Sequence, residues 1–586
     1  NRTSEVGIES METLAAGPHG GKNIIRGWAV DKFRCRALPL SVKGGGEAVL
    51  KRSCRKDIRL VFGLHDDAAS GFDIVLPDGM PAFDLIIETP GKSLSRHMTI
   101  SRIRGLLRRD HVQKRMRQML YYVFHAWTPA GMRALLAAVK RRFTKKQGFY
   151  EDWIKHHETM TRHDCEELIR GFHTLPLISV VVPVYNVEET WLRRCVESMQ
   201  NQWYPNWQLC LADDCSSSPS VKPVMRDLAE HDSRIKVVFR EQNGRISAAT
   251  NSAIELATGE YVGFMDNDDE LAPQALFEVV KAINENPETD FIYTDEDKIT
   301  EDGVRFDPFF KPDFSPNLLL GHNYITHFVV VSTQLLGRTG LLRSQYDGSQ
   351  DYDFVLRSTE QARSIRHIPQ QLYHWRTLAS SVAGDPHSKM YAYEAGRRAI
   401  EAALERRGVR GSVSMLDNLG TYKIDYEAGS PSVAVLVSSY TPRQLEAVKK
   451  LTDYTSVRFI PLDGRDVNDI ARECDEPLLV LLDGLKPTNS AWLRGMVNYS
   501  RISGIGAAGG KVFDDRQRVL NVGVTLKALR SGPPFELRGE WDVGIGYYFR
   551  DLLPRDLFAV TEACLLVSRK NFCDLHGFDK RLPPGL

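Results

Sequence analysis

The alternation of apolar runs with amphipathic stretches between residues 177 and 408 constrains the fold of this chain most. Runs such as 178–182 and 208–212 predict strands, and residues 188–200, with helical spacing of apolar side chains, predict a helix between them. Strands that alternate with helices favour a parallel sheet in an α/β domain. Further strands are expected at 235–239, 261–265 and 291–294. We therefore expect one α/β domain over residues 175–411.

The rest of the chain divides by composition, since 586 residues exceed what one hydrophobic core can serve. Residues 22–101 carry short β-type runs separated by turn residues, which predicts a small β-sandwich. Residues 102–174 are predicted to be a basic helical linker, because 102–146 hold thirteen Lys or Arg and one acid, Asp110. The expected remainder is a disordered or linker stretch at 1–21, a linker at 412–430 and a second α/β region at 431–586.

Composition excludes several classes of protein. A net charge of +1 argues against a nucleic-acid partner, and no run approaches the length of a membrane-spanning helix. Nine scattered cysteines without a CxxC pair predict reduced thiols, and the first 21 residues lack the pattern of a secretory signal. We expect a cytoplasmic protein. The basic helices 102–146 could bind the anionic inner face of the cytoplasmic membrane, or could be a solvated or interdomain surface.

Acidic and aromatic side chains follow three of the predicted strands. Because the carboxyl ends of parallel strands meet at one edge of a sheet, these groups should face one site. Clustered carboxylates raise one another's pKa unless a cation lies between them, and Mg²⁺ or Mn²⁺ with a diphosphate is the simplest remedy. The alternative for each acid alone is a helix cap or turn. The strand-end residues are Pro183, Tyr185 and Asn186, then Asp213 and Asp214, then Asp266, Asn267, Asp268 and Asp269.

The order of motifs from residue 181 to residue 376 resembles family 2 glycosyltransferases of the GT-A fold, a Rossmann-like nucleotide-diphospho-sugar transferase fold. The resemblance is to the bacterial branch that builds O-antigen, capsule and related surface polysaccharides. It is carried by VVPVYN at 181–186, ADDCS at 212–216, FMDNDD at 264–269, YTDEDK at 293–298, FKPD at 310–313, GSQDYD at 348–353 and LYHWR at 372–376.

This resemblance implies roles for particular residues. Tyr185 would stack on the nucleotide base, Asp214 would hydrogen-bond it, and Asp351 would be the general base. Asp268 and His374 would bind the metal, although a histidine between Tyr373 and Trp375 could equally be packed in the core. The expected nucleotide-binding set is Pro183, Tyr185, Asn186, Asp213, Asp214, Gly244, Asn251, Asp266 and Arg376, and the sugar-lining set is Asp295, Glu296, Asp297, Gln350 and Trp375.

Two of these assignments have alternatives in the sequence. Asp353 competes with Asp351 as the base, but it lies two residues further into a helix and is expected to face another way. The three acids at 295–297 could be solvated acids of an exposed loop instead of sugar ligands. Gln350 stands where many relatives have Glu, which removes a like charge beside the base.

The implied function is an inverting, Mn²⁺- or Mg²⁺-dependent transfer of a sugar from a UDP- or dTDP-sugar. The expected acceptor is a hydroxyl of a growing, polyprenyl-diphosphate-linked bacterial glycan. One rival is a non-catalytic scaffold or glycan-binding protein that organises other transferases. The other is a nucleotidyltransferase, which also pairs carboxylates with metal but leaves the motifs at 350–351 and 374–376 unexplained.

The second α/β region is similar to a GT-A domain at 438–440, 481–485, 563–567 and 576–579. Only Asp483 remains of its metal motif, so this region is expected to be an incomplete and inactive GT-A-like domain. The GxGxxG at 504–509 follows a helical stretch and precedes a strand, the reverse of a dinucleotide site. In the β domain, Trp28 and Phe72 are expected in the core, with glycan binding as the alternative.

Overall fold

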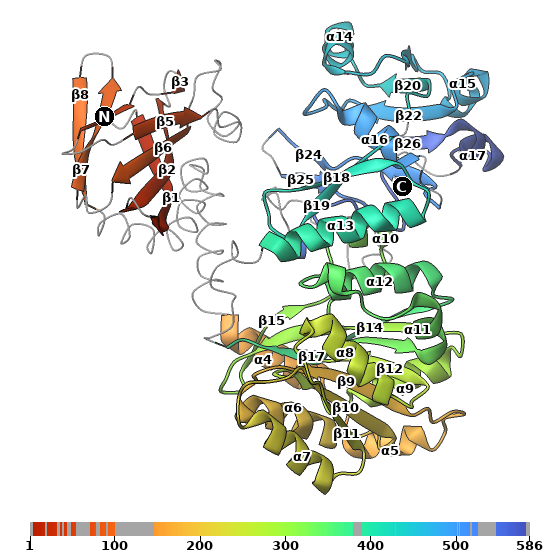
Figure 1. Cartoon of the computed structure of the whole chain (residues 1–586). Helices are drawn as coiled ribbons and strands as arrows, with labels where there is room; N and C mark the ends of the chain where they lie inside the picture. The colour runs from red at the N-terminus through yellow and green to blue at the C-terminus, as the bar shows by residue number, and fades with distance from the viewer. Residues whose placement is uncertain are drawn as a thin grey trace. The chain divides into compact units, whose positions relative to one another are not determined.

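The computed structural model describes the strands of residues 4–99 and the ranges 146–378, 390–427, 429–500, 504–515, 518–524 and 547–579, together with residues 502 and 581. It divides the chain into two compact units, 1–146 and 147–586 (Figure 1). The predicted basic helices fall almost entirely at 102–145, outside the described residues. Their contact with a membrane therefore stays a prediction.

The first unit consists of two antiparallel sheets. The strands of the first sheet, in spatial order, are β1 (Ser4–Gly17), β2 (Gly20–Asp31), β6 (Gly71–Pro77) and β5 (Val49–Ser53), with β3 (Arg36–Ala37) beside β2. The second sheet holds β4 (Leu40–Lys43), β7 (Ala82–Thr89) and β8 (Lys92–Thr99). β1 lies in the stretch expected to be a linker. Its pairing with β2 shifts register between Ile8 and Ser10, so the alternation that marks a strand is interrupted there.

A nine-stranded mixed sheet forms the centre of the second unit. Its spatial order is β11 (Ile235–Phe239), β10 (Trp207–Asp213), β9 (Ile178–Val184), β12 (Tyr261–Phe264), β16 (Val329–Ser332), β14 (Phe291–Ile299), β17 (Ile365–Arg376) and β13 (Glu270–Leu271), with β15 (Arg305–Phe309) beside β14. The predicted α/β class is confirmed, but the sheet is not all parallel. The chain enters β16 from the carboxyl edge, where Val329 pairs with Phe264, so β16 runs opposite to β12.

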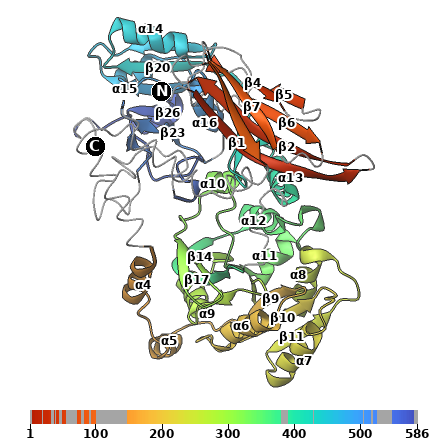
Figure 2. The ribbon, with the colours of Figure 1, turned by 90° about the vertical axis from the view of Figure 1, so that its left-hand side faces the viewer.

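Helices cover both faces of this sheet (Figure 2). One face packs on α6 (Glu189–Gln200), α7 (Val221–His231) and α9 (Ala275–Glu285). The other packs on α8 (Arg245–Leu256), α11 (Thr333–Thr339) and α12 (Gln350–Gln361), while α10 (Pro316–Gly321) and α13 (Met390–Arg406) belong to the same core cluster, with α13 against α12. Val180 and Val182 belong to one core cluster and Val181 to the other, because successive strand side chains point to opposite faces.

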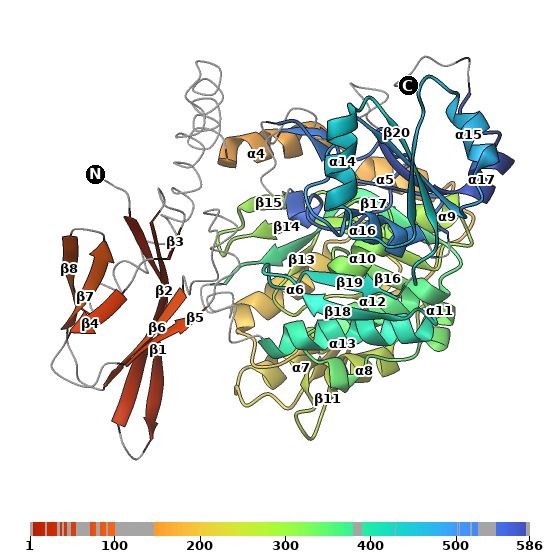
Figure 3. The same cartoon turned by 90° about the horizontal axis from the view of Figure 1, so that it is seen from above.

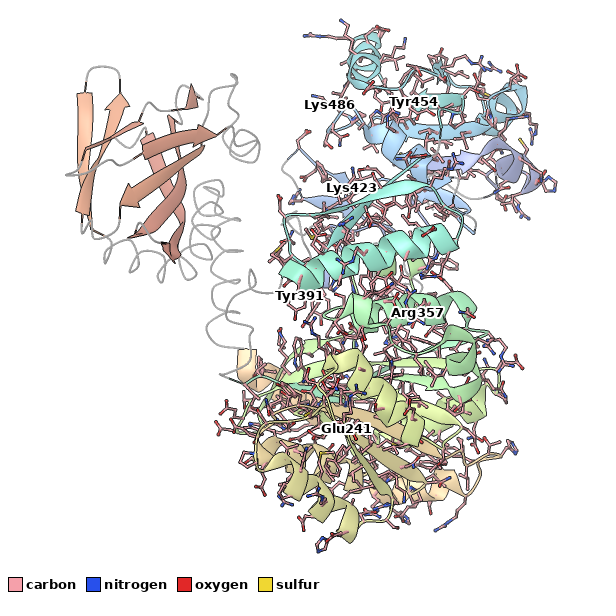
Figure 4. All side chains as sticks on the ribbon, in the orientation of Figure 1. Glu241, Arg357, Tyr391, Lys423, Tyr454 and Lys486 are labelled. Atoms are coloured by element: carbon pink, nitrogen blue, oxygen red, sulfur yellow. The ribbon has the colours of Figure 1, made fainter. Side chains whose placement is uncertain are left out.

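A two-stranded sheet occupies the stretch expected to be a linker at 412–430. It pairs β18 (Gly411–Met415) with β19 (Tyr422–Tyr426), and α13 lies along it (Figure 3). In β19 the apolar residues Tyr422, Ile424 and Tyr426 are buried, while Lys423 between them points outward (Figure 4). This alternation, over only five residues, is the signal that predicts the strand.

The second α/β region builds a smaller sheet. Its spatial order is β21 (Val457–Pro461), β20 (Val433–Ser438), β22 (Leu478–Asp483), β26 (Cys564–Ser568) and β23 (Ala507–Gly509). The first three strands are parallel and β26 is antiparallel, which repeats the arrangement of β10, β9, β12 and β16. The GxGxxG segment contributes β23 and does not begin a helix.

Two helices, α4 (Lys146–His157) and α5 (Arg162–Ile169), precede the central sheet in the chain. The helices of the smaller sheet are α14 (Pro442–Leu451), α15 (Val467–Glu473), α16 (Trp492–Ser500) and α17 (Arg569–Asp574). Two short strands, β24 (Val512–Phe513) and β25 (Val519–Asn521), pair with each other. Across the described ranges, every helix is too short or too polar to cross a bilayer.

Candidate active site

Three side chains that could hold a metal ion meet just beyond the carboxyl end of β12. Asp266 and Asp269 follow this strand, and His327 comes from the segment that leads into β16. One nitrogen or oxygen of each lies within 4.8 Å of those of the others. Tyr373 supports two of the three: its hydroxyl donates to Asp269 Oδ2 at 2.5 Å, and its ring stacks on His327 with centroids 4.5 Å apart.

Residues 266–269, which we call the acidic loop, hold carboxylates that repel one another. Burial, and then the charge of Asp266, raise the pKa of Asp268 above its usual value. Burial, Asp266 and Asp268 raise the pKa of Asp269 still further, although that carboxylate accepts hydrogen bonds from Tyr373 and from the Arg376 amide. A divalent cation would relieve this repulsion, and carboxylate oxygens with one imidazole nitrogen suit Mn²⁺ or Mg²⁺. The residues present therefore fit the expected metal.

Arg376 lies beneath this acidic loop. Its side chain is fully buried, donates from Nε to the Asp268 carbonyl at 2.8 Å and pairs with Glu270. Its guanidinium also lies over the Trp191 ring, 4.7 Å from the centroid. Arg376 was expected beside the diphosphate; in the structure its side chain is held by these contacts within the protein.

Asp351 is the second residue of α12, and its electrostatic surroundings include the acidic loop. Asn323 Nδ2 donates to Asp351 Oδ2 at 2.9 Å. Burial raises the pKa of Asp351, His327 lowers it, and Asp266 raises it, which shows that all three groups interact electrostatically. A carboxyl with a raised pKa is a stronger proton acceptor than an ordinary aspartate.

The competing acid, Asp353, is fully buried and paired elsewhere. It accepts from the side chains of Arg343, which precedes α12, and of Arg357, one turn further along α12 (Figure 4 labels Arg357). Gln350 is held locally, since its Oε1 accepts from the Gly348 amide at 2.9 Å. Asp351 is therefore the carboxylate of this helix that is not consumed by an ion pair.

The ends of β9 and β10 form the neighbouring part of the same edge. Tyr185 is 51% exposed, as a base-stacking ring must be. Asp214 is buried, and its Oδ1 accepts from Arg240 Nε and from the Gly244 amide, both at 2.9 Å. A Cβ on Gly244 would lie 2.7 Å from the Ala248 Cβ and 2.6 Å from Arg240 Nη2, so an added side chain would displace both.

The remaining nucleotide-binding candidates have partners within the protein. Asp213 Oδ1 accepts from the Ser216 amide at 3.0 Å, and Asn186 Oδ1 accepts from the Ser218 amide at 3.0 Å. The Pro183 carbonyl accepts from Asn267 Nδ2 at 2.7 Å, which ties β9 to the acidic loop. Asn251 exchanges two hydrogen bonds with the Leu342 backbone, so its amide holds α8 in place.

The acids of residues 295–297 are not in an exposed loop. They lie in β14, and their side chains are 1%, 7% and 1% exposed. Their charges are met by residues distant in the sequence, and they pair as follows: Asp295 with His367 at 2.9 Å, Glu296 with Lys311 at 2.9 Å, and Asp297 with Arg305 at 2.7 Å and with His374 at 2.7 Å. The expectation of solvated loop acids is wrong, because β14 continues along β17 past the predicted end at residue 294.

Two aromatic side chains of the LYHWR segment have different surroundings. His374, predicted to bind metal, is buried against Asp297; the group of described side chains that could hold a metal ion contains His327 instead. Trp375 is 45% exposed and contacts His327 edge to face, with centroids 6.5 Å apart. Three residues of the site carry no assigned role in the sequence: His327 and Asn323 lie outside the motifs of the resemblance, and Lys311 lies in the FKPD motif but has partners that are distant in the sequence or in the backbone.

Comparison with known proteins identifies the central domain. Residues 179–337 match the family Glycosyl transferase family 2, so the chain contains a family 2 glycosyltransferase domain, and the predicted enzyme class is confirmed. The chain is 35% identical over 75% of its length to the uncharacterized protein y4gI of Sinorhizobium fredii, covering 53% of that protein. It is 30% identical over 74% of its length to the O-antigen biosynthesis protein RfbC of Myxococcus xanthus, covering 37% of it.

Among solved structures, TarS 1–349 of S. aureus in complex with UDP-GlcNAc is 21% identical. The match covers 39% of this chain and 66% of that one, with a TM-score of 0.32. The chain spans about half or less of the length of the two relatives with which it aligns over three quarters of its own length.

Proposed function

We propose that this protein transfers a sugar from a UDP- or dTDP-sugar to a hydroxyl of a bacterial surface glycan, with inversion at the anomeric carbon. The observation that carries the proposal is the meeting of Asp266, Asp269 and His327, whose ligand atoms lie within 4.8 Å of one another, in a domain that matches the family Glycosyl transferase family 2. One relative is named for O-antigen biosynthesis and another for teichuronic acid biosynthesis, which supports a polysaccharide acceptor.

Asp266, Asp269 and His327 would hold Mn²⁺ or Mg²⁺, with Asp268 beside them. When bound, the ion supplies a Lewis acid that stabilises negative charge on the departing nucleoside diphosphate. Tyr373 and Arg376 orient the carboxylate of Asp269 through its two hydrogen bonds, as outer-shell groups of metal sites commonly do.

Asp351 would act as the general base. Its carboxylate takes the proton of the acceptor hydroxyl as that oxygen attacks the anomeric carbon, opposite the leaving diphosphate. The carbon–oxygen bond to the acceptor forms while the bond to the nucleoside diphosphate breaks, so one displacement inverts the configuration. Asn323 fixes one carboxylate oxygen of Asp351 by its hydrogen bond.

The other end of the edge would hold the nucleotide. Tyr185 presents an exposed ring for stacking on the base, and Asp214, fixed by Arg240 and Gly244, would accept a hydrogen bond from it. Trp375, exposed beside His327, would pack on a sugar ring. We further propose a lipid-linked acceptor, with the basic residues 102–146 holding the protein at the inner face of the cytoplasmic membrane.

Calorimetric titration with UDP, dTDP and GDP, in Mn²⁺ and in EDTA, tests the proposal. Wild-type protein should bind UDP or dTDP only with Mn²⁺, and Asp266→Ala should abolish this binding. Asp483→Ala is the matched control. Asp483 ends β22 in the smaller sheet, which is the position that corresponds to the end of β12, where the acidic loop begins, in the larger sheet. Asp483→Ala should bind like wild type, and Asp351→Asn should bind but fail to transfer sugar.

Two outcomes would contradict the proposal. Failure of wild-type protein to bind any nucleotide with Mn²⁺ present would favour the scaffold. Loss of binding in Asp483→Ala, with Asp266→Ala unaffected, would move the nucleotide site to the smaller sheet.

A further inference from the structure

Residues 547–556 of the second α/β region, which we call the docking strap, lie against the central domain. The strap follows the central segment 307–322 along most of its length. Tyr547 Oη donates to the Pro308 carbonyl at 2.6 Å and accepts from the Phe310 amide at 3.0 Å. The Tyr548 ring stacks on Phe309 with centroids 3.8 Å apart and an angle of 7° between the rings.

The other end of the strap contacts the start of α10. Asp556 Oδ2 accepts from Ser315 Oγ and from the Asn317 amide, both at 2.9 Å, and its Oδ1 accepts from Asn317 Nδ2 at 2.5 Å. The Asp556 amide in turn donates to Ser315 Oγ at 2.9 Å. Asp556 therefore satisfies a free amide in the first turn of this helix and fixes its position.

Between these ends, the strap reaches the residues next to Asn323. Leu553 is buried against Gly321, where an added Cβ would lie 3.2 Å from its methyl carbons. Phe549 meets the His322 ring edge to face at 5.1 Å. Tyr548 and Phe549 have φ values of 47° and 65°, a region that costs conformational energy for residues other than glycine. Their contacts with the central domain offset that cost.

Segment 307–323, which the docking strap contacts, supports the site in two places. Asn323, directly after His322, donates to the carboxylate of Asp351. Lys311, directly after Phe310, is fully buried and donates to Glu296 and to the carbonyls of Ile325 and His327. A shift of residues 307–323 would therefore move the base and the loop that carries His327 together.

We propose that the second α/β region is a positioning element of the transferase site, which acts through the docking strap on Asn323 and so on Asp351. This proposal rests on the proposed function for the role of Asp351. It gives the smaller sheet a task that needs no nucleotide or metal of its own. Asn323 and Tyr548 are positioning residues, since neither is placed to touch the reacting atoms.

The central test is Tyr548→Ala, which removes the ring stacked on Phe309, with Phe558→Ala as control. Phe558 lies two residues beyond the strap and is 65% exposed. Hydrogen exchange of the amides of 307–323 should quicken in Tyr548→Ala and stay as in wild type in Phe558→Ala. Tyr548→Phe keeps the ring and should restore wild-type exchange.

Turnover gives the second readout, measured as metal-dependent release of UDP or dTDP from UDP-glucose, UDP-N-acetylglucosamine and dTDP-rhamnose, with water as acceptor. Tyr548→Ala should lower kcat by about 10- to 100-fold, the cost of displacing a catalytic group by roughly 1 Å. Donor KM should stay within about twofold, because the nucleotide edge is untouched. Asn323→Ala should change kcat and donor KM in the same way. The double variant should lose little more kcat than either single variant, since both substitutions interrupt the same path from the docking strap to Asp351.

Several results would overturn the proposal. Unchanged exchange of 307–323 in Tyr548→Ala would show that the strap does not hold the segment. Equal changes of kcat and KM, or fully additive effects of the two variants, would show separate or merely structural roles. Failure of the proposed function would look different: wild-type protein itself would neither bind UDP or dTDP with Mn²⁺ nor turn over a donor, and the exchange measurement would still decide whether the strap holds 307–323.

Discussion

Replacing Lys311 by methionine should destabilise the protein strongly, although the side chain has almost the same length. Lys311 is fully buried, and its ammonium donates to Glu296 Oε2 at 2.9 Å and to two backbone carbonyls. Burial lowers the pKa of Lys311 while Glu296 opposes that effect. Methionine would leave the Glu296 carboxylate buried with hydrogen bonds from Thr326 and the His327 amide, but with no cation.

The expected magnitude follows from this burial. Removing one partner of a buried pair costs about 3–5 kcal/mol, because the other charge stays desolvated. Lys298→Met is the matched control: Lys298 pairs at 2.8 Å with Asp307, whose side chain is 49% exposed. Such a surface pair contributes about 0–1 kcal/mol. Urea unfolding followed by tryptophan fluorescence should therefore separate the two variants clearly.

A second substitution shows whether the charge is the cause. Glu296→Gln in the Lys311→Met background removes the stranded carboxylate, so it should recover most of the lost free energy of unfolding, to within about 1–2 kcal/mol of wild type. The reasoning is refuted if Lys311→Met costs no more than Lys298→Met. It is also refuted if the double variant is less stable than Lys311→Met alone.

Two further predictions concern the site. Burial raises the pKa of Asp351, and a general base must be unprotonated to act. We therefore expect kcat/KM to fall as the pH drops through a value above the ordinary aspartate pKa of about 3.9. A profile of kcat/KM that stays flat down to about pH 4 in saturating Mn²⁺ would contradict this. Gly244→Ala should lower the free energy of unfolding by about 1–3 kcal/mol and weaken UDP binding, since the new Cβ meets the Ala248 Cβ as well as Arg240. Gly337→Ala in α11, where a Cβ meets nothing within 4 Å, should not destabilise the protein, and equal effects of the two changes on UDP binding would refute the argument.

The elements that sequence could predict are those with a local pattern. The central strands and α6 carry apolar periodicity, and the acids at their ends follow from the chemistry of a sheet edge. β19 also has a strict alternation, but in only five residues between turn residues. β1 was hidden for another reason, since the shift of register at Ile8 breaks its alternation.

The parts of the site that sequence could not predict depend on long-range contacts. The three acids of β14 look solvated in the sequence because their partners lie far away in the chain; Asp297, for example, accepts from Tyr150 Oη at 2.5 Å. His327 joins Asp266 only because β16 enters the sheet from its carboxyl edge. His374 was assigned to the metal by its motif, but Asp297 pairs with it in the next strand.

The two sheets share a strand arrangement but differ in the polar groups at their carboxyl edges. In the larger sheet, the residues after β12 include three carboxylates, and Tyr185 at the end of β9 is exposed. In the smaller sheet, Asp483 at the end of β22 accepts from Ser438 Oγ at 2.8 Å, and the Tyr440 hydroxyl turns inward to the Leu485 carbonyl. The polar groups at this second edge thus satisfy one another, where those of the first edge leave charge for a cation. Fold alone does not specify function, and the second α/β region contacts the central domain through the docking strap, at residues that precede Asn323.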